Sequence, residues 1–231
     1  MSLRRRFTVA AILVWIGVLP WTAASGQAQS NGAPELRFLF ALGAVTGPAD
    51  KPHLQGVQND AVLRSGDRLK FFVEPRTTAS AYVLHQAADG ELTVIAPAEG
   101  RPATLEPGRA VYVPAADNWL QLDHQTGTER FHVVVASQRI ESLDALLVGH
   151  AAVTEKSALQ ASSEAILNEI KQLRLKHRNL STPAEKPVRL GGSLRAPETT
   201  GSGALLDIAP LAAEITVPGG VYIRTITIDH R

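Results

Sequence analysis

The stretch YVLHQAADGELTVIA, residues 82–96, decides the fold class of this 231-residue chain. Two runs rich in apolar residues, 82–86 and 91–96, flank the dipeptide Asp89-Gly90. Asp-Gly between two such runs is the strongest short-range signal for a β-hairpin, because a type I′ turn needs positive φ angles. We therefore predict an antiparallel hairpin here, within a mainly β protein.

Other parts of the chain show the same period of two. In residues 68–74 every second side chain is apolar and those between are mostly charged, which is typical of a half-buried strand. Residues 130–137 repeat the pattern, with His132 expected to point outward. Further strands are expected at 35–42, Val111–Val113, 119–122, 214–217 and 221–228. We expect the terminal strands to return to the sheet that begins near residue 35.

The spacing becomes helical after residue 137. Apolar residues at intervals of three and four predict helices over 140–148 and 158–178, with Gly149 ending the first. Residues 179–203 are rich in Pro and Gly and predict a flexible loop. The expected fold is an antiparallel β-sandwich or open barrel with an inserted helical segment, about 140–178, before the C-terminal strands.

The first 28 residues predict an export signal. Arg4, Arg5 and Arg6 precede a short apolar run, which ends in small residues before Ala28. We expect cleavage near residue 28, a periplasmic or secreted bacterial protein, and one β-rich domain over 29–231. No later stretch is long and apolar enough to span a membrane, so we expect no span after cleavage.

Charge and cysteine content exclude several function classes. The formal net charge of +1 includes three arginines of the export segment, and residues 29–231 carry 20 basic and 22 acidic side chains. A body without excess positive charge is not built for nucleic acid. The absence of cysteine excludes disulfides, thiolate metal sites and a thiol nucleophile.

Several short motifs occur in a fairly specific order. They are Leu63-x-x-Gly66-Asp67-x-Leu69, the strand of Tyr82, Asp89-Gly90 with Leu92, Pro97, Pro114, and Gly127-x-Glu129 ending in Ala136-Ser137. Over about residues 60–147 this order resembles the bacterial domain of unknown function 4384 family. The resemblance implies an exported, β-rich accessory or binding domain, and it supplies no catalytic residues.

The chain lacks complete catalytic, cofactor and metal motifs. None of the seven histidines forms a His-x-His, His-x-x-x-His or His-Glu-x-x-His pattern, so we expect no metal. There is no Gly-x-Ser-x-Gly, and Gly191-Gly192 lacks the Lys-Ser/Thr of a phosphate-binding loop. Ser65 fits a tight turn better than a nucleophile. We therefore expect no catalytic residue and no cofactor.

Four residues remain as candidate ligand contacts: Asp67, Tyr112, Trp119 and Glu129. The two aromatic residues could stack on a sugar ring or a partner, although a tryptophan on a sheet is more often core. Asp67 and Glu129 could form a carboxylate pair. Their simpler interpretations are a cap of the turn for Asp67 and an ion pair with a neighbouring base such as Arg130 for Glu129.

The sequence therefore predicts an exported, non-catalytic envelope module that binds a protein or an envelope polymer. Two alternatives stay open. One is a carboxylate-dependent hydrolase of cell-envelope material, which requires Asp67 and Glu129 to face one pocket. The other is a structural protein whose C-terminal strand completes a partner's sheet.

Overall fold

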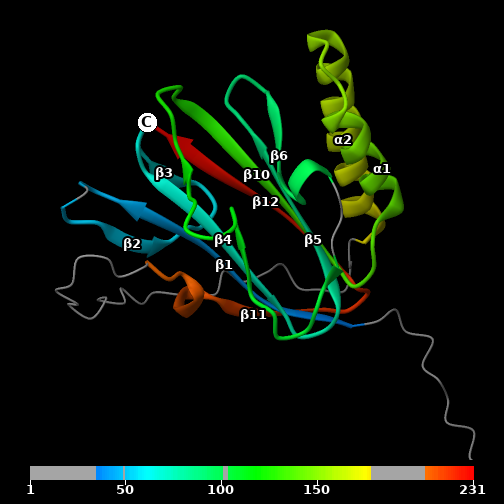
Figure 1. Ribbon diagram of the computed structural model, residues 1–231, viewed down its shortest axis with the longest axis horizontal. Coiled ribbons are helices and arrows are strands. Elements are labelled where there is room, and N and C mark those ends of the chain that lie inside the picture. The colour runs from blue at the N-terminus through cyan, green and yellow to red at the C-terminus, as the bar shows by residue number, and fades with distance from the viewer. Residues whose placement is uncertain (1–34, 49, 101–103, 178–205) are drawn as a thin grey trace, which may run out of the picture. The chain divides into compact units, whose positions relative to one another are not determined.

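The computed structural model describes residues 35–48, 50–100, 104–177 and 206–231, all of which belong to one compact unit, Gly32–Arg231. The expected export signal and the loop expected over 179–203 lie outside the described residues. The described residues form two β-sheets, and two helices follow the first ten strands and precede the two C-terminal strands (Figure 1). This arrangement confirms the expected fold class. Neither sheet closes into a barrel.

The first sheet is built around a long N-terminal strand. It pairs with one strand along one side and with two shorter strands along the other. The members of this sheet are β1 (Leu36–Thr46), β2 (His53–Gly56), β4 (Arg68–Pro75), β8 (Val111–Val113), β9 (Leu120–Gln121) and β11 (Ala213–Val217). Along the main path their order is β11-β1-β4-β8.

The second sheet has the order β3-β12-β10-β5-β6. Its members are β3 (Ala61–Leu63), β5 (Ala79–Gln86), β6 (Leu92–Ala96), β7 (Thr104–Leu105), β10 (Gly127–Ala136) and β12 (Val221–His230). Among the described strands every pairing is antiparallel except that of β3 with β12, which is parallel. This short parallel pairing departs from the purely antiparallel expectation.

The main core lies between the two sheets. Leu69, Phe71 and Val73 of β4 face Phe131 and its neighbours on β10, and all are buried as the period of two predicts. The rings of Phe71 and Phe131 lie 5.4 Å apart between their centroids.

Both outer faces of the sandwich are also covered. Helices α1 (Glu141–Ala151) and α2 (Lys156–Lys176) lie against the second sheet (Figure 1) and bury Tyr82, Leu84 and Val134. The His132 side chain points away from the inter-sheet core, as expected. The helices cover this face of the sheet, so the side chain is buried and not exposed to solvent. Gly149 does not end α1, which continues to Ala151.

A segment after residue 205 covers the outer face of the first sheet. Ile208, beside the short helix η2 (Ala209–Leu211), packs on Ala41 and Phe72. A Cβ atom added to Gly43 would lie 2.5 Å from Ile208 Cγ2, so only glycine permits this close approach. This cover explains why Phe72 sits on the otherwise polar face of β4.

The predicted hairpin forms between β5 and β6, with a different turn from the one expected. Gly90 has a φ of +91°, and its N–H donates to the carbonyl oxygen of Ala87 at 2.9 Å. Asp89 does not have a positive φ, so the type I′ assignment is wrong. The short helix η1 (Ala98–Gly100) follows β6.

The two C-terminal strands separate into different sheets. β11 pairs with β1, as expected, whereas β12 pairs with β10 over its whole length. The expectation that both return to the first sheet is therefore wrong for β12. Its burial pattern explains this choice, because Ile226 and Ile228 enter the inter-sheet core beside Phe131. The C-terminal segment thus joins the two layers.

Candidate functional site

The structure places the four candidate contact residues in different surroundings. Tyr112 in β8 and Trp119 just before β9 lie on the outer face of the first sheet. Asp67 occupies the turn before β4, and Glu129 lies in β10 of the second sheet. Only the aromatic pair comes together around a shared side chain, so we take this pair as the candidate site.

That shared side chain is Lys70 of β4. Its ammonium nitrogen lies 5.6 Å from the ring centroid of Tyr112 and 5.0 Å from that of Trp119. Arg68, two residues earlier on the same face, lies 5.8 Å from the Trp119 ring. At these distances a cation is attracted to the electron-rich face of an aromatic ring. We call Arg68, Lys70, Tyr112 and Trp119 the aromatic platform.

Lys70 acts as a buried support for the platform. Its side chain is only 5% exposed, and Nζ donates a hydrogen bond to the carbonyl oxygen of Ala116 at 2.5 Å. Burial lowers the pKa of Lys70, although Asp117 and Asp207 partly oppose this shift. The sequence pattern assigned Lys70 to the solvent face and missed this role, which depends on a loop that folds over the strand.

Tyr112 is fixed by a second contact. Its hydroxyl donates to Asp207 Oδ1 at 2.8 Å, and its ring meets Phe72 edge to face with centroids 5.3 Å apart. Burial raises the pKa of the Tyr112 hydroxyl, with the bond to Asp207 as the next cause. The rings of Tyr112 and Trp119 are both half-buried, so each ring is packed on one side and partly exposed to solvent.

Asp67 caps its own turn. Its Oδ2 accepts a hydrogen bond from the Arg64 N–H at 2.8 Å, and the Asp67 N–H donates to the Arg64 carbonyl oxygen at 3.0 Å. This is the simpler of the two interpretations made from the sequence. The carboxylate is therefore engaged by the backbone of its own turn.

Glu129 is buried in a polar cluster of four side chains. Its Oε2 lies 2.6 Å from His85 Nε2, and its Oε1 lies 3.5 Å from His230 Nδ1. The other nitrogen of His230, Nε2, lies 3.1 Å from Ser65 Oγ. The expected pairing of Glu129 with Arg130 is wrong, because adjacent strand residues point to opposite faces. No spacing in the sequence identifies this cluster, whose members lie up to 165 residues apart.

Ser65, His230 and Glu129 have the atom order of a hydrolase triad, but the geometry differs in three ways. The His230 side chain is fully buried, and its Nδ1 has no hydrogen-bond partner in the described chain. The N–H groups of Ser65 and Gly66 both donate to backbone carbonyl oxygens, at 3.4 and 2.8 Å, so neither is free for an oxyanion. The cluster joins the 64–67 turn, β10 and the end of β12.

The described residues contain no group of three or more His, Cys, Asp or Glu side chains arranged to hold a metal ion. The hydrogen-bond distance between His85 and Glu129 fits direct contact, with no space for an ion between them. Asp67 and Glu129 do not line a shared pocket among those described.

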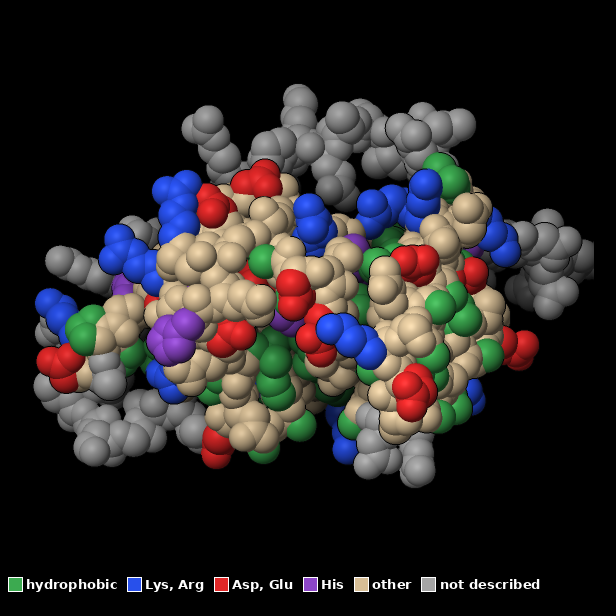
Figure 2. All heavy atoms as spheres, turned by 90° about the horizontal axis from the view of Figure 1, so that it is seen from above, with side chains coloured by type: hydrophobic (Ala, Val, Ile, Leu, Met, Phe, Trp, Pro, Cys, Tyr) green, Lys and Arg blue, Asp and Glu red, His purple; other side chains and the backbone are tan. Residues whose placement is uncertain are grey.

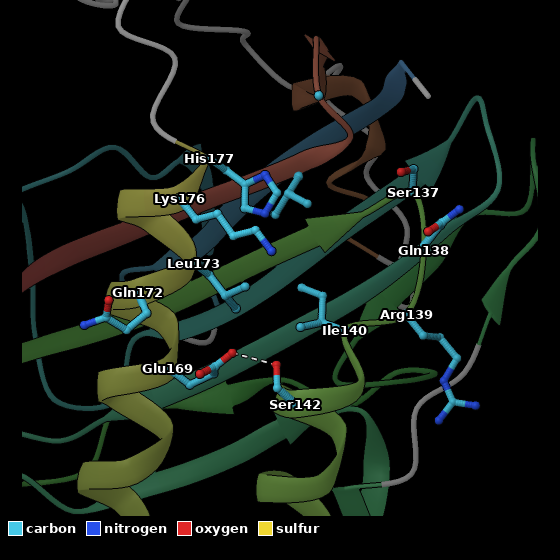
Figure 3. Close-up of a pocket in the computed structure, with 12 residues that line it drawn as sticks. Ser137, Gln138, Arg139, Ile140, Ser142, Glu169, Gln172, Leu173, Lys176 and His177 are labelled. Carbon is cyan, nitrogen blue, oxygen red and sulfur yellow. Dashed lines mark hydrogen bonds between the residues drawn. The ribbon is translucent and has the colours of Figure 1, made fainter. Parts of the chain in front are cut away.

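Two surface pockets have linings that include no residue of the platform. One of about 380 Å³ is lined by Ser65, Gly66 and residues 121–124. The other, of about 500 Å³, lies where α1 begins and α2 ends, and sequence reasoning did not identify it. Figure 3 shows Lys176 and His177 directed into it, and the Ser142 hydroxyl donating to Glu169 Oε1 at 2.6 Å across the two helices.

Charge is mixed on the surface. On the face shown in Figure 2, acidic and basic side chains lie interspersed and neither sign forms a continuous field. The described part of the chain contains no helix of the length and apolar character needed to cross a bilayer.

These features define a class of protein. It is a two-sheet β protein with a pair of helices packed on one sheet and a half-buried pair of aromatic side chains on the other. Residues 62–139 match the model of a family described as Domain of unknown function (DUF4384). The match confirms the resemblance seen in the sequence. The family description names no reaction. No curated protein and no solved structure matches the chain.

Proposed function

We propose that this protein is an exported, non-catalytic envelope module that binds a polymer through the aromatic platform. The single observation that carries the proposal is the position of Lys70 between Tyr112 and Trp119, at 5.6 and 5.0 Å from their ring centroids. A supported and partly exposed aromatic ring is suited to stack on the apolar face of a sugar ring. Arg68 beside Trp119 adds a donor for hydroxyl or carboxylate groups.

The ligand class follows from the side chains around the platform. Asp117 and Asn118 are exposed in the loop before Trp119 and supply polar groups at its edge. One or two stacking residues with a polar rim suit a repeating sugar, and the repeated units of an envelope polysaccharide would offer many binding sites along one polymer. Export to the periplasm or the medium, which the first 28 residues predict, would bring the protein to such a polymer.

Sedimentation of the protein with purified peptidoglycan sacculi tests the proposal. We expect the wild type to pellet with sacculi and Trp119→Ala to bind at least about tenfold more weakly, as for a tryptophan at the centre of an interface. Trp119→Phe should keep most of the binding, and Glu106→Ala, at an exposed site elsewhere, should keep all of it. Equal pelleting of wild type and Trp119→Ala would contradict the assignment of the platform.

Export has its own test. N-terminal sequencing of the protein recovered from the periplasm or medium should give a start at Gln29 or Gln27, after cleavage at small residues. A mature protein that starts at Met1 would contradict it.

The second candidate, a hydrolase of envelope material, is favoured by one observation, the chain of contacts from Ser65 through His230 to Glu129. It would use Ser65 as the nucleophile and His230 as the base, in place of the Asp67–Glu129 pair that the hydrolase alternative required. A fluorophosphonate probe should label such a serine. Labelling that Ser65→Ala abolishes would support the hydrolase, and absence of labelling would favour the binding module.

A further inference from the structure

Among the described residues, strand β12 has one open edge over half its length. On one side it pairs with β10 from Val221 to His230. On the other side β3 covers only Ile228, Asp229 and His230. Asn59 and Asp60 extend this cover by one residue: Asn59 Oδ1 accepts from the Thr227 N–H, and the Asp60 N–H donates to the Thr227 carbonyl oxygen.

The direction of the Thr227 groups shows which residues face the open edge. In an antiparallel ladder the N–H and C=O of one residue point to the same side, and the side alternates along the strand. Since Thr227 faces β3, the backbone groups of Val221, Ile223 and Thr225 face the same side. The Gly220 carbonyl oxygen accepts from the Ser137 N–H after β10, which agrees with this alternation. No described backbone group bonds to these three residues.

The other sheet edges carry features that limit pairing. The outer strands of the first sheet, β2, β8, β9 and β11, have five residues or fewer. At the far edge of the second sheet, the ladder of β6 is interrupted by a register shift at Val83/Leu84. Natural proteins use short strands and bulges of this kind to prevent unwanted strand addition. Residues 221–226 (VYIRTI) have no proline, no bulge and a single charge.

We propose that a second copy of this chain occupies the edge, with two β12 strands antiparallel across a twofold axis through Ile223. This register places Ile223 opposite Ile223 of the other copy and Val221 opposite Thr225, which pairs β-branched residues at these three positions. The one charged side chain, Arg224, then lies opposite Tyr222 and not opposite another arginine, so the contact has no like-charge repulsion. Closed twofold contacts of this type are the commonest in soluble oligomers.

The absence of cysteine from the natural chain allows a direct test of the register. In a hydrogen-bonded antiparallel pair the Cα atoms lie about 5.5 Å apart, within the range that a disulfide can span. Under mild oxidation Ile223→Cys should form a cross-linked dimer. Val221→Cys alone and Thr225→Cys alone should not, whereas a mixture of these two variants should cross-link to each other.

Proline variants test whether the edge itself makes the contact. Ile223→Pro removes an N–H that no group in the described part of the chain accepts, so the fold should persist while self-association weakens by about tenfold or more. Arg224→Pro, the matched control, removes an N–H that faces β10 and should lower the unfolding temperature. Light scattering and circular dichroism measure the two effects. A wild type that is monomeric at high concentration, or a dimer unaffected by Ile223→Pro, would overturn the proposal.

Discussion

The buried imidazole of His132 makes the protein sensitive to acid. His132 lies on β10 beneath α2, where its Nδ1 is 3.1 Å from Thr225 Oγ1 and its Nε2 has no hydrogen-bond partner in the described chain. Arg174 also donates to Thr225 Oγ1, so the threonine hydroxyl is free to donate to Nδ1 of a neutral ring. Burial lowers the pKa of His132 from 6.5 to about 4, and Arg174, Arg130 and His85 add to this shift.

The magnitude follows from the two pKa values. Between pH 6.5 and pH 4 the unfolded chain binds a proton at His132 that the folded chain does not bind, so the folded state loses stability as the pH falls. The full difference of about 2.5 pKa units corresponds to about 3 kcal/mol, most of which is lost by pH 4.5. Above pH 6.5 the ring is neutral in both states and contributes no pH dependence.

Urea unfolding at pH 7.5 and pH 4.5, followed by far-UV circular dichroism, measures this loss. Other groups also titrate in this range, so the informative quantity is the difference between wild type and His132→Leu. We expect the variant to lose about 2–3 kcal/mol less on acidification, because leucine takes up no proton. His53→Gln, at an exposed position, should behave like the wild type. An equal acid loss in wild type and His132→Leu would refute the reasoning.

Three further substitutions test the packing around the two sheets by urea or thermal unfolding. Glu129→Ala leaves the histidines of the polar cluster without their carboxylate and should lower the free energy of unfolding by about 3–5 kcal/mol. Glu106→Ala, at an exposed position, should change it by less than about 0.5 kcal/mol. Similar values for the two variants would show that Glu129 does not stabilise the fold. Tyr82→Phe removes the hydroxyl that donates to Asp144 Oδ1 at 2.8 Å and should cost about 1–3 kcal/mol, with no change expected if that hydroxyl were dispensable. Gly43→Ala should cost about 1–3 kcal/mol because its Cβ meets Ile208, while Gly56→Ala, at the paired position with open space around it, should cost clearly less.

The elements that the sequence predicted well are those with local signals. The period of two in 68–74 and 130–137 became β4 and β10, and the helical spacing after residue 140 became α1 and α2. Features that depend on cover from distant segments were not predictable. Lys70 and His132 occupy positions that the local pattern assigns to solvent, and both are buried by elements far away in the chain.

In the candidate site, too, some features have a local sequence signal and others depend on distant segments. Tyr112 and Trp119 could be selected as an aromatic pair, because their types and strand positions are visible in the sequence. Their support by Lys70 depends on the pairing of β4 with both β8 and β9, a register that no local spacing specifies. β2 was likewise missed, since it forms in a stretch with Pro52 and Gly56 and gains its strand structure only from pairing with β1.

The limits of the family match bear on what the domain needs in order to fold. The matched segment, residues 62–139, contains β4, β5 and β10 but neither β1 nor either of the two C-terminal strands, β11 and β12. Yet β1 pairs with β4 over eight residues, and β12 pairs with β10 over ten. The side chains that complete the inter-sheet core, among them Phe38, Phe40 and Ile226, come from these two strands. The matched segment alone would therefore expose one side of each central strand and a large part of its apolar core, so the strands on either side of it belong to the same folding unit.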